Sequence, residues 1–146
     1  MRAPVLALCI TGAILIVSVD TFAQRPSSAN DLASLKAALG PYIGKTCSMK
    51  VDLPGTFVEN IDEIVEKGGR IFVHHRLYSE YVWHDAGMLP LSKGSNGWAA
   101  AFVSDSGDEL SYNPGPDPQH LRLKVVTPHS ARPPREYLYA CVPTKP

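Results

Sequence analysis

The stretch of sequence that decides the fold is KTCSMKVDL, residues 45–53. Its apolar side chains occupy every second position from Cys47 to Leu53 and alternate with polar or small ones. This period of two is the pattern of a β-strand with one buried face. Pro54-Gly55 follows and is a turn signal. The folded part of the chain therefore includes a half-buried strand, and that strand carries a cysteine.

Further strands are predicted along most of the remaining chain. The segment from Arg70 to Trp83 alternates in the same way, and its predicted apolar face consists of Ile71, Val73, His75, Leu77, Tyr81 and Trp83. Shorter strands are expected at Met88 to Leu91, Gly97 to Val103, Glu109 to Asn113, Gln119 to Val126 and Glu136 to Val142. Loops rich in proline, glycine and serine separate them. This spacing favours a mainly β domain, an antiparallel meander of about six to eight short strands, over alternating βαβ units.

One short N-terminal helix is expected before the strands. Ser28 and Asp31 match a capping box, leucines recur at helical spacing from Leu32 to Leu39, and Gly40-Pro41 is a stop signal. The segment Thr56 to Lys67 fits either element. Its apolar residues match a helical face, whereas its β-branched residues and the Gly68-Gly69 pair that follows indicate a strand and a hairpin turn. The sequence leaves both alternatives open.

The first 23 residues have the features of a secretory signal peptide. Arg2 precedes an apolar run from Val5 to Val19, and Thr21-Phe22-Ala23 is a small-x-small cleavage signal. As a helix the run spans roughly 22 Å, less than the ~30 Å of a bilayer core, so no stable membrane anchor is expected after cleavage. We therefore expect a periplasmic or secreted protein cleaved near Ala23, with a flexible segment at 24–30 and a single domain at 31–146.

The two cysteines of the mature chain, Cys47 and Cys141, are expected to form a disulfide because export takes them into an oxidising compartment. The bridge closes a loop of about 95 residues, for which chain entropy gives ~4.5 kcal/mol of stabilisation. Bridged cysteines have Cα atoms within about 7 Å of each other. The first and last strands must then lie side by side or face each other, so the meander curls into a barrel or folds into a sandwich.

Composition and motifs exclude several kinds of function. The 14 Lys and Arg residues balance the 14 Asp and Glu residues, and this neutrality argues against nucleic-acid binding. No histidine or cysteine spacing indicates a metal site, no G-x-S-x-G motif indicates a serine nucleophile, and no cofactor is implied. We predict no catalytic residue. An envelope hydrolase that uses His84 and Asp85 is retained as the least favoured hypothesis, and whether the protein is an enzyme stays open.

Aromatic residues beside polar, glycine-rich loops give the best functional indication. Trp83 and Trp98 flank such loops, an arrangement suited to the mouth of an apolar pocket. The predicted ligand-binding residues are His75, Tyr81, Trp83, His84 and Trp98. The leading hypothesis is a non-catalytic protein that binds a small apolar or amphipathic ligand inside the curled sheet. The alternative is a module that binds or inhibits a protein partner through its Pro-rich loops or a sheet edge.

Overall fold

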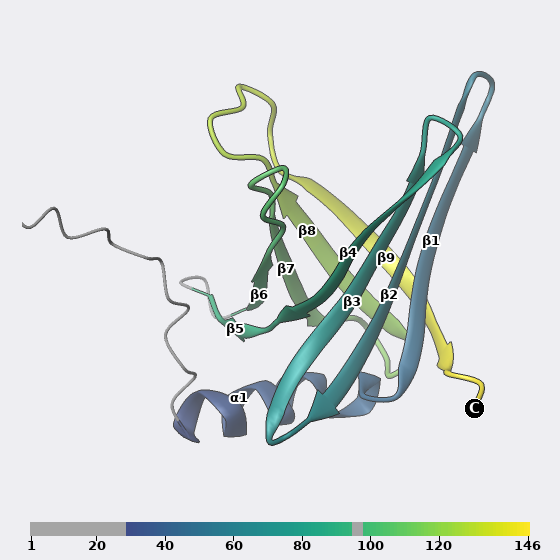
Figure 1. Ribbon diagram of the computed structural model, residues 1–146. Helices are drawn as coiled ribbons and strands as arrows, with labels where there is room; N and C mark the ends of the chain where they lie inside the picture. Colours follow the sequence, from purple (N-terminus) through teal and green to yellow (C-terminus); the bar gives the residue numbers. More distant parts are fainter. Residues whose placement is uncertain (1–28, 95–97) are drawn as a thin grey trace, which may run out of the picture.

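The computed structural model describes residues 29–94 and 98–146, which fold into one curled antiparallel sheet and one short helix (Figure 1). The nine strands of the described chain are β1 (Lys45–Leu53), β2 (Thr56–Lys67), β3 (Arg70–Ser79), β4 (Val82–Pro90), β5 (Ser92–Lys93), β6 (Ala99–Phe102), β7 (Glu109–Pro114), β8 (His120–Val126) and β9 (Arg135–Pro143). The signal peptide predicted at 1–23, and residues 24–28 after it, lie outside the described residues.

The sheet is a meander that closes almost completely into a barrel. Its strand order is β4-β3-β2-β1-β9-β8-β7-β6-β5, so every pair except β1–β9 joins strands consecutive in the chain. The two edges, β4 and β5, are separated by Leu91 alone. The Leu91 N–H still bonds to the Ile71 carbonyl of β3 at 2.9 Å, whereas Ser92 already pairs with Ala100 of β6. The chain thus passes continuously from β4, one edge of the sheet, to β5, the other edge. Of the two predicted arrangements, barrel and sandwich, the barrel is confirmed.

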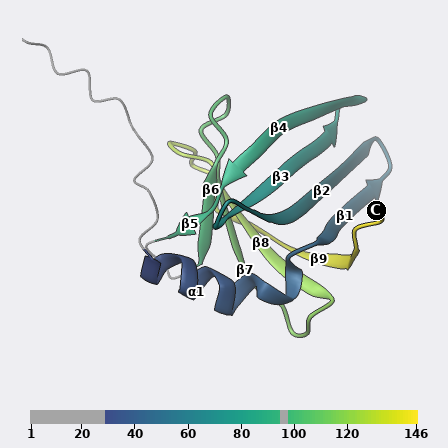
Figure 2. The ribbon, with the colours of Figure 1, turned by 60° about the horizontal axis from the view of Figure 1, so that its bottom comes forward.

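The helix α1 (Ala29–Leu39) lies across one end of the barrel (Figure 2). Leu35 and Leu39 are buried there against the barrel core, and a short 3-10 helix, η1 (Gly40–Tyr42), continues to the start of β1. The predicted helix is confirmed and begins at Ala29, within the segment expected to be flexible; the Ser28 of the expected capping box lies outside the described part. The helix therefore covers one end of the barrel, and a cavity is found at the other.

The segment Thr56 to Lys67, which the sequence left between helix and strand, is strand β2. Gly68 and Gly69, with φ of 59° and 71°, form the two-residue turn to β3, which needs positive φ at both positions. The inward positions of β2 include Asn60 and Asp62, which are buried although they are polar. Asn60 and Asp62 made the β-strand pattern of this segment hard to recognise in the sequence, because a period of two is normally identified from apolar residues on the inner face.

The disulfide between Cys47 and Cys141 is confirmed. The two residues are direct partners in the β1–β9 ladder, with Cα atoms 3.9 Å apart and an S–S distance of 2.03 Å. This ladder contains only four residue pairs, Lys45 to Ser48 against Ala140 to Pro143, whereas β1 forms nine pairs with β2. The covalent link therefore lies in the shorter of the two ladders that hold β1.

The loop between β7 and β8 is held by buried Tyr42. The Tyr42 hydroxyl donates to the carbonyls of His120 at 2.7 Å and Asp117 at 3.1 Å, and accepts the N–H of Gly115 at 3.1 Å. A Cβ at position 115 would lie 2.2 Å from the His120 carbonyl oxygen. Only glycine fits this close approach of two backbone segments.

Replacing Gly115 with alanine is expected to lower the free energy of unfolding by about 1–3 kcal/mol, because the backbone must shift to relieve the overlap. Urea unfolding followed by tryptophan fluorescence measures the change. Gly40→Ala is the matched control, since a Cβ there meets no atom within 4 Å. Equal stabilities of the two variants would contradict the proposed steric role of Gly115.

Candidate functional site

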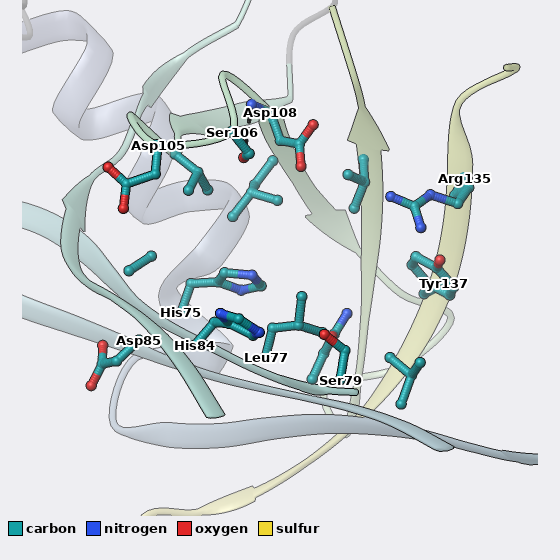
Figure 3. Close-up of a pocket in the computed structure, with 16 residues that line it drawn as sticks. His75, Leu77, Ser79, His84, Asp85, Asp105, Ser106, Asp108, Arg135 and Tyr137 are labelled. Atoms are coloured by element: carbon teal, nitrogen blue, oxygen red, sulfur yellow. Dashed lines mark hydrogen bonds between the residues drawn. The ribbon is translucent and has the colours of Figure 1, made fainter. Parts of the chain in front are cut away.

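A cavity of about 440 Å³ occupies the barrel at the end away from α1 (Figure 3). Its walls come from strands β2, β3, β4, β7, β8 and β9 and from the loop between β6 and β7. Most of the wall is apolar and is formed by Val58, Leu77, Val103, Leu110 and Val125. The sheet is open beside this cavity, because β4 and β5 are its two edges and no ladder among the described strands joins β4 to β5 or β6.

Polar side chains enter this cavity from three directions. His75 and His84 lie beside each other on the β3–β4 wall, Asp105 and Asp108 come from the β6–β7 loop, and Arg135 lies across from the histidines on β9 (Figure 3). Site arrangements of this kind, an apolar wall with a few polar groups, are typical of small-molecule pockets of ~300–1,000 Å³.

A buried polar network supports His75 from behind. The carboxylate of Asp62, which is 0% exposed, accepts the Nδ1–H of His75 at 2.5 Å and the hydroxyl of Tyr112 at 2.8 Å. Because a carboxylate only accepts hydrogen bonds, Nδ1 carries the proton. The ring is thereby fixed in one orientation, and Nε2 is the nitrogen left for the cavity.

The same network changes the acid–base properties of its members. Burial alone would lower the pKa of His75, but the hydrogen bond and charge of Asp62, together with the charges of Asp108 and Asp85, outweigh burial and raise it above 6.5. Burial and the charge of Asp62 raise the pKa of the Tyr112 hydroxyl well above 10. Tyr112 is therefore a permanent donor to Asp62, whereas His75 keeps its positive charge to a higher pH than an ordinary histidine does.

The raised pKa of His75 predicts a pH-dependent contribution to stability. A histidine whose pKa is higher in the folded than in the unfolded state stabilises the fold fully below about pH 6.5, and this contribution is lost as pH rises through the folded pKa. The difference in unfolding free energy between the wild-type chain and His75→Gln should therefore shrink from pH 5.5 to 8.5. Exposed His129→Gln is the control, and a difference independent of pH would contradict the assignment.

Two buried atoms in the cavity wall have no hydrogen-bond partner among the described residues. They are the Oδ1 atom of Asn60, which is 6% exposed, and the Oδ1 atom of Asp108. The nearby Tyr139 hydroxyl interacts with Asn60 and Asp62, and burial together with the charge of Asp62 raises its pKa well above 10. An unpaired buried polar atom costs about 1–3 kcal/mol, so such atoms at a cavity wall indicate a place where a ligand can bond.

His84 lines the cavity, but it does not pair with Asp85. The Asp85 side chain instead bonds to His74 Nε2 at 2.8 Å and to the Gly87 N–H at 2.7 Å, and these two bonds lower its pKa. His84 is opposite Leu77 in the β3–β4 ladder, whereas Asp85 is opposite Arg76. The arrangement on which a His84–Asp85 hydrolase depended is therefore not formed.

The prediction that Tyr81 and Trp83 share the face of His75 is wrong. Strand β3 ends at Ser79, and Glu80 and Tyr81, with φ of 51° and 65°, form a two-residue turn. Trp83 is consequently opposite Tyr78, with ring centroids 5.2 Å apart, on the outer surface of the barrel. Tyr81 is 89% exposed at the turn. Neither residue lines the cavity.

Trp98 also lies outside the cavity. It lines a separate open depression together with Arg122, Leu138 and neighbouring residues of β8 and β9. Of the five predicted ligand-binding residues, the structure brings only His75 and His84 together. Sequence reasoning missed Asn60, Asp62, Asp108 and Tyr112. Asn60 and Asp62 could have been found only by reading Thr56 to Lys67 as a strand and asking why its inner face is polar.

Within residues 29–94 and 98–146, no group of three or more histidine, cysteine, aspartate or glutamate side chains is arranged to hold a metal ion. No helix in those ranges has the length and apolar content to cross a membrane. Neither a protein-family model, a curated protein nor a solved structure matches the chain significantly.

Proposed function

We propose that this protein binds a small amphipathic ligand in the cavity at the open end of its barrel. The observation that carries the proposal is the cavity itself, about 440 Å³ in volume and largely apolar, with His75 and Asn60 in its wall. Filling it with the apolar part of a ligand removes hydrocarbon surface from water, at about 25 cal/mol per Å². The polar part of the ligand bonds to the side chains gathered at the wall.

Binding is favoured over catalysis by the contacts that the polar side chains already make. Ser106, one of two serines at the cavity, accepts the Asp108 N–H at 3.3 Å, and Asp85 is held by His74. The His75 Nδ1 is held by Asp62. In the part of the chain that the structure describes, no hydrogen bond joins a serine hydroxyl to His75, the contact that an activated nucleophile needs.

Blocking the cavity should abolish ligand binding. Leu77→Trp places a larger side chain into the cavity from β3 and is expected to weaken binding of a neutral fluorescent probe, N-phenyl-1-naphthylamine, by more than about tenfold. Leu138→Trp, on the exposed face of β9, is the matched control and should bind normally. Equal affinities of the two variants, or no probe binding by the wild-type chain, would contradict the proposal.

The proposed site of action is the periplasm or the extracellular space. The confirmed disulfide is compatible with an oxidising environment, and the first 23 residues have the pattern of a signal peptide. We expect N-terminal sequencing of the protein purified from its own host to begin near Gln24. A mature chain that begins at Met1 would contradict export by this route.

A second candidate function, binding of a protein partner at a sheet edge, is favoured by the surface of β4. This edge strand and its turn expose Tyr81, Val82, Trp83 and Met88. Edge strands with exposed apolar side chains can accept a strand from another chain. Cross-linking in extracts of the host, compared between the wild-type chain and Trp83→Lys, tests it; identical cross-linked products would count against the edge as an interface.

A further inference from the structure

We propose that the ligand carries a positively charged amine, which bonds to Asp108 and Asn60 while its apolar part fills the cavity. This inference rests on the proposed binding function and specifies the chemical class of the ligand. It depends on two features of the cavity and one of the ligand. The cavity has acceptor atoms without partners, and its other charges are neutralised or solvated. The ligand's ammonium group has the donors that these acceptors need.

The first feature is a pair of buried acceptor atoms without partners. Asp108 and Asn60 both line the cavity, and the Oδ1 atom of each is buried and has no hydrogen-bond partner among the described residues. Asn60 is 6% exposed, so its side chain cannot be satisfied by turning to solvent. The backbone of Asp108 is held in place, because its carbonyl accepts the Val103 N–H at 2.9 Å.

The second feature is the charge balance around these atoms. His75 and Asp62 form a pair with opposite charges when the imidazole is protonated, and Asp85 is bonded to His74. Asp105 and Arg135 line the rim and are exposed to solvent. Solvent screens exposed charges, whereas an interaction near a buried oxygen is weakened less. The carboxylate of Asp108 is thus the charge in the lining best placed to select a ligand, and it selects a cation.

The third feature is the chemistry of the head group. An alkylammonium has three N–H donors and no acceptor, as the lysine side chain has, so it complements acceptor atoms. A carboxylate has acceptors only and would face the oxygens of Asp108 and Asn60 without a hydrogen bond. A neutral alcohol can donate only one bond and has no positive charge to pair with that of Asp108. The cavity therefore ranks the three head groups as amine, alcohol and carboxylate.

The test compares three ligands with the same chain length, n-octylamine, 1-octanol and octanoate, as competitors of N-phenyl-1-naphthylamine at pH 7.5. We expect the amine to bind at least about tenfold tighter than the alcohol, as a charged hydrogen bond implies, and octanoate to bind weakest. Asp108→Asn should reduce the affinity for the amine to that for the alcohol and leave alcohol binding unchanged. Asp52→Asn, which removes an exposed carboxylate of β1 outside the cavity lining, is the control and should keep the preference.

The possible outcomes separate this inference from the function on which it rests. Octanoate binding as tightly as the amine, or an amine affinity that Asp108→Asn leaves unchanged, would overturn the inference while the binding function stands. Failure of the wild-type chain to bind the fluorescent probe and every competitor would overturn both. Circular dichroism and thermal unfolding of Asp108→Asn, an almost isosteric change, establish that any loss of amine binding occurs in a folded protein.

Discussion

Asp62→Ala is expected to lower the free energy of unfolding by about 3–5 kcal/mol, the cost of removing one partner from a buried charged pair. The side chain is fully buried and accepts hydrogen bonds from both His75 and Tyr112. Its loss leaves two buried donors without an acceptor and a cavity between β2 and β7. Because the net stability of a domain is only about 5–15 kcal/mol, much of the variant should be close to unfolding at 37 °C.

Urea unfolding at pH 7 measures this effect, and two further variants identify its cause. Asp52→Ala removes an exposed carboxylate of β1 and should change the stability by less than about 0.5 kcal/mol. Asp62→Asn keeps the shape but loses the charge, so it should be destabilised and the pKa of His75 should fall, which an NMR titration of the ring protons can follow. Stability unchanged in Asp62→Ala would show that the network contributes nothing to the fold.

Removal of the disulfide should have a comparable effect. The two cysteines are separated by 94 residues in the chain, and a loop of this length gives ~4.5 kcal/mol in the chain-entropy account. The bridge also lies in the four-pair ladder between β1 and β9, which has few backbone bonds of its own. The double variant Cys47→Ala, Cys141→Ala should therefore unfold at a much lower urea concentration and lose binding of the fluorescent probe.

Comparison of oxidised and reduced wild-type protein provides the control for this double variant. Reduction of the folded protein, with the thiols kept reduced by excess reductant, should produce a destabilisation of similar size without a change of side chain in the core. Exposed Val142→Ala, in the same strand, should have little effect. If the free energy of unfolding fell by less than about 1 kcal/mol in both the variant and the reduced protein, the β1–β9 ladder would close the barrel without the disulfide.

Much of the fold was predictable because its strands follow the period of two and its cysteines are few. The alternation from Cys47 to Leu53 and the pairing with Cys141 together required a closed or folded sheet, and this is what the structure shows. The choice between barrel and sandwich was not predictable, since either brings the first and last strands together. The structure is a barrel because the chain passes directly from β4, one edge of the sheet, through Leu91 to β5, the other edge. The pairing partners of β4 and β5 define this passage, and the local sequence does not determine those partners.

The candidate site was less predictable for two physical reasons. The turn between β3 and β4 consists of Glu80 and Tyr81, which lack the usual glycine or asparagine, so the sequence resembled one continuous strand. A two-residue turn moves each later residue to the opposite face from that expected, and Trp83 was misplaced for this reason. Asp62 was missed because a buried carboxylate is identified by its partners, and His75 and Tyr112 lie on other strands.

The bridge between Cys47 and Cys141 also determines what happens when the chain is cut. The loop from Thr127 to Pro134 between β8 and β9 is exposed throughout, so it is a natural target for proteases. Cleavage there leaves two fragments that the sulfur link still joins, and the strands on both sides remain paired with neighbours. A nicked molecule should therefore migrate as a single band in a denaturing gel until a reducing agent is added.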